Sequence, residues 1–221
     1  TFDEESFKIK LTVAQNRSMV DFALNGGVSD NIKELPVLWR RGALAFGEIF
    51  MAKSTGGYSV DRQTLRAALL EIQKMGATAS VHAEDEALNA QKTKELFNDN
   101  SADVYSRMRP PESEASAVRE AVSLERETGA AMHITHVSAA KTVELLLGEP
   151  ITCDVTPHHL LLNTRHWEKL KARAKMNPPL RAERDVEALL LAGVGSTTCG
   201  SLTAMALLKV KAWVLGSVQC S

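Results

Sequence analysis

The residues best suited to chemistry in this sequence are one glutamate and two histidines that lie far apart along the chain. Glu48 interrupts the apolar run FGEIFMA, and His82 and His136 each follow a short apolar stretch. Carboxylate and imidazole groups are ligands that a catalytic zinc ion accepts, with one position kept open for water. Zinc-bound water becomes a hydroxide near neutral pH and can attack an amide carbon. The three residues therefore predict a hydrolase that uses one or two zinc ions.

Each of these residues also has a structural interpretation. A histidine at the end of a strand is commonly held by hydrogen bonds in the surrounding protein. Glu48, between Phe46 and Phe50, is harder to explain in this way, because an unpaired carboxylate in an apolar run costs free energy. A metal ion or an arginine would serve as its partner. Three such residues on separate strands favour the metal site.

Other polar residues have weaker claims to a metal. His133 lies three residues before His136, so in a strand it faces the opposite side and is predicted to be structural. His158 and His159 are adjacent, so at most one of them can face a site, and a role in loop structure explains both. Asn177 precedes two prolines, which hold it extended. Its amide offers donors and an acceptor, which suits the edge of an amide or imide ring.

The elements that must position these residues alternate between strand-like and helix-like patterns. We expect strands over residues 7–14, 43–52, 78–83, 130–138 and 151–156, and helices over 59–77, 111–130, 138–150 and 181–190. This alternation indicates βα units and a parallel sheet, either doubly wound or closed as a (β/α)₈ barrel. A glycine-rich phosphate loop follows none of the expected strands, and a barrel places reactive residues at several strand ends. We therefore predict an α/β fold that is part of a (β/α)₈ TIM barrel.

Composition excludes several classes of partner. The 26 basic and 27 acidic residues are interspersed and give a net charge of −1, so neither nucleic acid nor an anionic membrane is expected to bind. No apolar run reaches the ~20 residues of a membrane span. Cys153, Cys199 and Cys220 form a sparse, odd set, which favours a reducing cytoplasm over a disulfide framework.

Both ends of the sequence are unusual. The chain begins TFDEESFKIK, without an initiator methionine, so we expect a segment of a longer protein. Residues 1–190 are predicted to form one partial barrel domain, and residues 191–221 an atypical tail. Within that tail, residues 191–208 carry no charge, which we interpret as the product of a frameshift or of mis-assembly. Reading the coding DNA in its other frames would test this hypothesis.

Four segments in succession carry a family resemblance: VHAEDEAL, HITHVSAAKTVELL, DVTPHHLLL and KMNPPLR. In this order they resemble the cyclic amidohydrolases, and most closely the dihydroorotases of the longer type. GALAFGEIFMA resembles the fourth-strand segment of the same family. The resemblance extends over about residues 7–190, and the combination of DVTPHHLLL with KMNPPLR is its most specific part.

The resemblance implies a metal-dependent amidohydrolase barrel in which zinc assists the opening or closing of a cyclic amide. Dihydroorotases interconvert carbamoyl-aspartate and dihydroorotate in pyrimidine synthesis. By this resemblance His82 and His136 are metal ligands and Asn177 binds substrate. Glu48 stands where hydantoinases carry a carboxylated lysine and some dihydroorotases an aspartate, and its two oxygens could hold metal without added CO₂.

The sequence departs from the family in two places. The family's His-x-His pair and its Asp-His-Ala-Pro-His element, whose aspartate is the general base, do not occur in the 221 residues. The catalytic base is therefore unassigned, and the chain alone is expected to show little activity. The alternatives are an allantoinase or hydantoinase, and a non-catalytic scaffold for aspartate transcarbamoylase. Partners would be the small-molecule substrate and either further copies of the chain or that transcarbamoylase.

Overall fold

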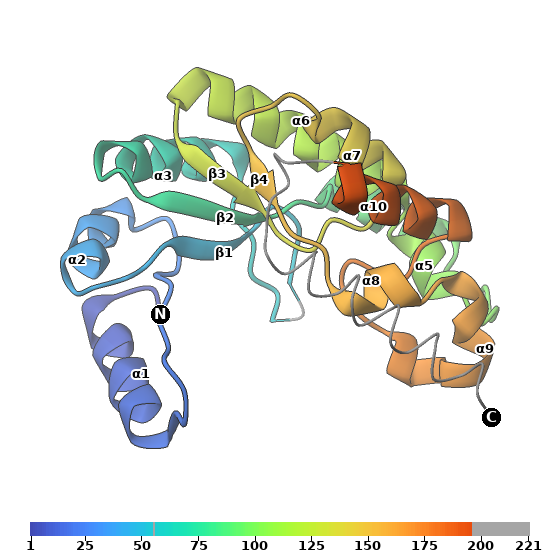
Figure 1. Cartoon of the computed structure of the whole chain (residues 1–221), viewed down its shortest axis with the longest axis horizontal. Helices are drawn as coiled ribbons and strands as arrows, with labels where there is room; N and C mark the ends of the chain where they lie inside the picture. The colour runs from blue at the N-terminus through green and yellow to red at the C-terminus, as the bar shows by residue number, and fades with distance from the viewer. Residues whose placement is uncertain (55, 196–221) are drawn as a thin grey trace. The chain divides into compact units, whose positions relative to one another are not determined.

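A sheet of four strands organises the part of the chain that the computed structural model describes, residues 1–54 and 56–195. The strands are β1 (Phe46–Phe50), β2 (Thr78–His82), β3 (Ala131–Ile134) and β4 (Thr152–Cys153), and their order in the sheet follows the chain. β1 and β2 run parallel, side by side in Figure 1. Helices lie in the connections between consecutive strands, so the predicted α/β organisation is confirmed.

The first of two compact units comprises residues 1–83 and 120–133. Its helical elements are α1 (Glu4–Arg17), the short 3₁₀ turn η1 (Ile32–Glu34), α2 (Leu35–Arg40) and α3 (Arg62–Lys74), together with the last part of α6 (Pro111–Thr128). α3 begins at Asp61, whose carboxylate accepts a hydrogen bond of 2.7 Å from the Thr64 amide. Leu65, Leu69 and Ile72 lie one turn apart and are buried, because α3 packs against β2.

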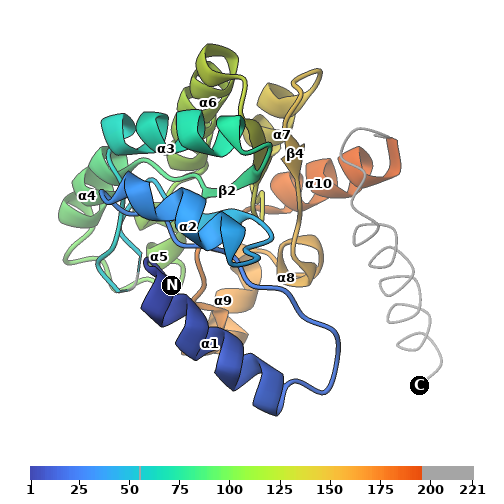
Figure 2. The ribbon, with the colours of Figure 1, turned by 90° about the vertical axis from the view of Figure 1, so that its left-hand side faces the viewer.

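Among the described residues, the second unit comprises 84–119 and 134–195. Its helical elements are α4 (Glu86–Glu95), α5 (Val104–Met108), the first part of α6, α7 (Ala140–Leu146), α8 (Pro157–Leu161), η2 (Thr164–His166), α9 (Trp167–Leu170), η3 (Lys171–Ala174) and α10 (Glu183–Gly195). α10 packs against α7 and α8, and Figure 2 shows these three helices together. Trp167, Ala174 and Leu180 form a small apolar cluster that Tyr105 and Met176 help to cover.

The structure corrects the prediction of a strand over residues 7–14, because this segment lies in α1. Asp3 caps the helix by accepting from the Ser6 amide at 2.7 Å, and Glu4 pairs with Lys8 one turn later at 2.6 Å. These local interactions outweigh the strand preference of the branched residues in FKIKLTVA. Phe7 is the buried side chain of α1, so the sequence of this helix lacks the continuous apolar face that would have predicted a helix.

Two further expectations change. The strand expected over 130–138 ends at Ile134, and residues 157–161, expected as loop, form the short helix α8. Residues 191–195 continue α10, and the rest of the predicted atypical tail lies outside the described residues.

Candidate metal centre

A bulge in β1 sets the position of Glu48. Phe46 pairs with Ala79 and Ile49 pairs with Val81, so two residues of β1 stand opposite the single residue Ser80 of β2. Gly47 has φ of +152°, and a β-carbon there would lie 2.4 Å from the carbonyl oxygen of Ser80. Glycine is therefore required at this position. The bulge shifts the alternation of β1 by one residue, and Phe46 and Ile49 are both fully buried on either side of it.

His82 is the last residue of β2 and faces Glu48. The Nδ1 atom of His82 lies 3.4 Å from Oε1 of Glu48. The imidazole packs against the Phe50 ring with 4.8 Å between centroids, and His82 is only 3% exposed. The Glu48 side chain is one third exposed. A buried imidazole beside a partly open carboxylate can hold a cation on the side that remains accessible.

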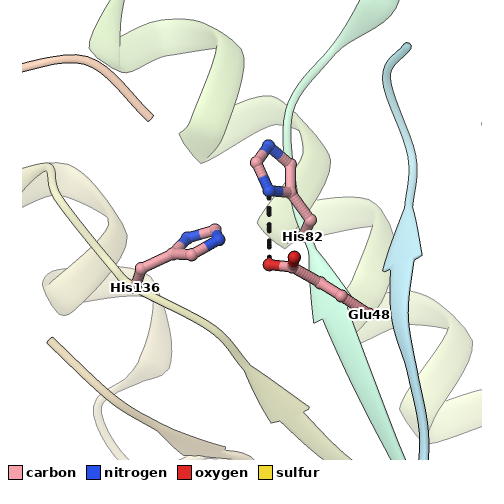
Figure 3. A group of neighbouring side chains, drawn as sticks. All are labelled: Glu48, His82 and His136. Atoms are coloured by element: carbon pink, nitrogen blue, oxygen red, sulfur yellow. Dashed lines mark ion pairs between the residues drawn. The ribbon is translucent and has the colours of Figure 1, made fainter. Parts of the chain in front are cut away.

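His136 completes a group of three possible donors with Glu48 and His82. One ligand atom from each lies within 4.8 Å of the others, and Figure 3 shows the His136 ring turned toward the other two side chains. Zinc–ligand bonds are about 2.1 Å long, so donors around a tetrahedral ion lie roughly 3.4 Å apart. The 3.4 Å between Nδ1 of His82 and Oε1 of Glu48 matches that spacing. The three residues singled out from the sequence are brought together, and their role as metal ligands stays a prediction.

Asn177 lies in a different setting, beside an aromatic ring. The Tyr105 hydroxyl donates to Oδ1 of Asn177, and the Lys175 ammonium group lies 4.9 Å from the centre of the Tyr105 ring. With its oxygen taken by Tyr105, the Asn177 amide keeps its N–H donors for another acceptor. A carbonyl or carboxylate oxygen of a substrate would fit. Binding of substrate by Asn177 stays a prediction.

His159 is held inside the second unit by hydrogen bonds. Its Nε2 lies 3.0 Å from the Pro178 carbonyl oxygen, and its Nδ1 lies 2.9 Å from the Thr156 hydroxyl. Because a carbonyl only accepts, Nε2 carries the proton and Nδ1 is the acceptor of a neutral ring. Burial lowers the pKa of His159 to about 3. His159 therefore ties the chain next to Asn177 in place, as the structural interpretation predicts.

Sequence reasoning missed two buried ion pairs in the second unit. Glu84, two residues after His82, pairs with Arg109 through a hydrogen bond of 3.0 Å from Nε and a second from the guanidinium end. Glu114 pairs with Arg181 at 3.2 Å, and both are almost fully buried. Glu84 directly after a strand and Glu114 on the apolar side of its helix were the available signals, since buried carboxylates need partners.

The charge state of Glu114 follows from its neighbours. Burial opposes ionisation of this carboxyl group, but the charge of Arg181 and the hydrogen bonds from Ser138 outweigh it. The pKa of Glu114 therefore lies below its usual value. A charged carboxylate in the interior can accept several backbone N–H groups at once.

Comparison with known proteins finds similar sequences among cyclic amide hydrolases. A dihydroorotase of Methanosarcina acetivorans is 44% identical over an alignment of 201 residues that covers 86% of this chain and 43% of that protein. An allantoinase of Bacillus velezensis is 33% identical over an alignment of 199 residues that covers 86% of this chain and 44% of the relative. Over most of its length the chain is therefore similar to cyclic amidohydrolases. No family model matches the chain.

Solved structures of cyclic amidohydrolases show the same fold. The L-hydantoinase of Arthrobacter aurescens superposes with a TM-score of 0.82 at 28% identity, over 87% of this chain and 45% of that chain. This likeness confirms the prediction of part of an amidohydrolase-type barrel. The chain spans less than half the length of the relatives it matches. Within the described residues, no helix is long and apolar enough to cross a membrane.

Proposed function

We propose that this chain is part of a zinc-dependent dihydroorotase. The convergence of Glu48, His82 and His136 within 4.8 Å carries the proposal, because all three come from separate segments of the chain. Identity of 44% to a dihydroorotase, against 33% to an allantoinase, favours dihydroorotate and carbamoyl-aspartate over the other cyclic amides. The role in pyrimidine synthesis is part of the same proposal.

The proposed metal ligands and the proposed substrate-binding residue have separate roles. When bound, zinc supplies an activated water for attack on the ring amide. His82 offers a donor whose position is fixed by the end of β2 and by the Phe50 ring. Glu48 offers two oxygens, enough for one ion or for a bridge between two. Asn177, oriented by Tyr105, would donate an N–H to a substrate oxygen.

The donor group also bears on the competing functions. A scaffold subunit without catalysis has no use for three converging donors, so the group favours an enzyme. A hydantoinase would be expected to carry a lysine at position 48, where this chain has glutamate. Allantoinase is the second candidate, supported by the 33% identical relative.

A chimera tests the proposal. The aligned residues of this chain would replace the matching segment of the Methanosarcina acetivorans dihydroorotase. We expect the chimera to bind zinc and to hydrolyse dihydroorotate at least about tenfold faster than allantoin or hydantoin. Hydrolysis of allantoin as the preferred substrate would replace dihydroorotase by allantoinase. A folded chimera without zinc would contradict the metal centre.

Variants of the chimera test the donors. Glu48→Gln or His82→Ala is expected to lower zinc affinity by more than the roughly 10–100-fold typical for loss of an outer hydrogen-bond partner. Glu112→Gln is the matched control, because this carboxylate is exposed on α6. Without the chimera's added segments, the 221-residue chain is expected to bind zinc but to turn over dihydroorotate slowly, if at all.

A further inference from the structure

The turn that carries His136 has an unusual set of backbone partners. Five consecutive N–H groups, from His136 to Ala140, each donate to an acceptor outside the turn. The acceptors are Asp154 Oδ1 for His136 (2.7 Å), the Asp154 carbonyl for Val137 (2.9 Å), Glu114 Oε1 for Ser138 (3.0 Å) and for Ala139 (3.1 Å), and Asp185 Oδ1 for Ala140 (3.0 Å). Three carboxylates therefore fix this turn, and they come from the residue after β4, from α6 and from α10.

Glu114 lies at the centre of this arrangement. Besides the two backbone groups, its carboxylate accepts from the Ser138 hydroxyl and pairs with the Arg181 guanidinium at 3.2 Å. Arg181 also donates through Nε to the Ser138 oxygen at 2.9 Å and through its other end to the Arg109 carbonyl. Both members of the buried pair therefore contact Ser138 in the turn. Removing either charge would leave the other buried without compensation.

The backbone of His136 explains why such support is needed. His136 has φ of +41°, which is uncommon for a residue other than glycine. Sparsely populated conformations persist where surrounding structure imposes them, and they concentrate at functional sites. A change of φ to the usual negative region would redirect the imidazole. The hydrogen bonds on both sides of His136 oppose that change.

We propose that Glu114, held by Arg181, is a positioning residue for His136. It acts by fixing the backbone of residues 138–139, which keeps the preceding histidine in the conformation that aims its ring at the metal. This inference rests on the proposed metal centre. It assigns a metal-related role to a residue that itself offers no ligand, because its carboxylate oxygens are already occupied.

A double-mutant cycle on the 221-residue chain separates positioning from general stability. Zinc affinity would be measured by competition with a chelator for wild type, Glu114→Gln, His136→Ala and the double variant. Loss of an outer partner typically lowers metal affinity by roughly 10–100-fold. We expect a loss of about tenfold or more from Glu114→Gln when His136 is present, and of less than about twofold when it is absent.

The cycle has outcomes that overturn the inference. Equal losses in both backgrounds would show that Glu114 acts on the protein as a whole and not through His136. An unchanged zinc affinity in Glu114→Gln would also overturn the inference, because it would show that Glu114 does not affect the metal centre. A second readout is the visible spectrum of the cobalt-substituted chain, which we expect to change in Glu114→Gln because the geometry of the His136 ligand changes.

Two further variants secure the result. Ser106→Ala removes the buried hydrogen bond of 2.9 Å from Trp167 Nε1, in the same unit but away from the turn, and is expected to lower stability with zinc affinity unchanged. If Glu114→Gln does not fold, Ser138→Ala replaces it in the cycle with a smaller expected loss. Absence of zinc binding in the wild-type chain would count against the proposed function. Zinc binding that responds to Glu48→Gln but not to Glu114→Gln would count against this inference alone.

Discussion

The strand-borne donors and the turn-borne donor of this protein are held in different ways. Glu48 and His82 lie on β1 and β2, where backbone pairing and a local bulge determine the direction of each side chain. His136 lies beyond the end of its strand, in a turn whose backbone is fixed by three carboxylates from distant parts of the sequence. These belong to Glu114, Asp154 and Asp185. Local pairing suffices for the first kind of donor, whereas the second depends on buried charge.

The largest expected effect comes from breaking the charged support of the turn. Arg181→Met leaves the Glu114 carboxylate buried without its cation, and we expect a loss of about 3–5 kcal/mol in the free energy of unfolding. Urea denaturation at pH 7 measures it. Arg165→Met is the control, because that arginine pairs with Glu183 on the surface and should contribute less than about 0.5 kcal/mol. Similar losses in the two variants would show that the buried pair is not special.

A somewhat smaller effect is expected from breaking the strand-borne support. Gly47→Ala places a β-carbon 2.4 Å from the Ser80 carbonyl oxygen, so β1 and β2 must separate locally. We expect a loss of about 3 kcal/mol in the free energy of unfolding, and weaker zinc binding because Glu48 moves. Gly129→Ala is the matched control, since Gly129 also has positive φ (+66°) but nothing within 4 Å of the added carbon. Its cost should be about 1 kcal/mol.

The smallest expected effect is the pH dependence of stability that comes from His159. Burial lowers the pKa of His159 to about 3, so the folded protein resists protonation at a ring that the unfolded chain protonates near pH 6.5. A lowered histidine pKa makes stability fall as pH drops below 6.5, and the loss levels off below pH 3. Between pH 7 and pH 5 the expected loss is about 2 kcal/mol. His159→Gln should flatten this part of the curve, and an unchanged slope in that variant would contradict a neutral buried ring.

The sequence was informative about the strand-borne donors. Alternating apolar runs and amphipathic helices predicted the βα order, and the positions of Glu48 and His82 in those runs predicted that they would meet. The spacing of apolar residues, every second residue in strands and about every 3.6 residues in helices, is a local property, so it can be recognised without knowledge of the fold. The bulge was not predictable from pattern, because the glycine at position 47 reports a close approach only once the neighbouring strand is known.

The support of His136 was beyond local pattern. Glu114 lies 67 residues before Arg181 in the sequence, and no spacing rule pairs the two. The prediction for α1 was wrong for a different reason. Its stabilising interactions, the Asp3 cap and the Glu4–Lys8 pair, are local, but its apolar pattern is too weak to indicate a helix. Buried charges therefore deserve a search for partners even where the pattern of apolar residues already accounts for the element that carries them.

The five occupied N–H groups of residues 136–140 give this turn a property usually reserved for regular secondary structure. Their amide protons should exchange with solvent as slowly as those of a central helix, because each is released only when its hydrogen bond to an acceptor on another segment breaks. The turn should also reject insertions that ordinary loops accept. One extra residue would place every following amide opposite the wrong oxygen, so the length of this connection is as constrained as its composition.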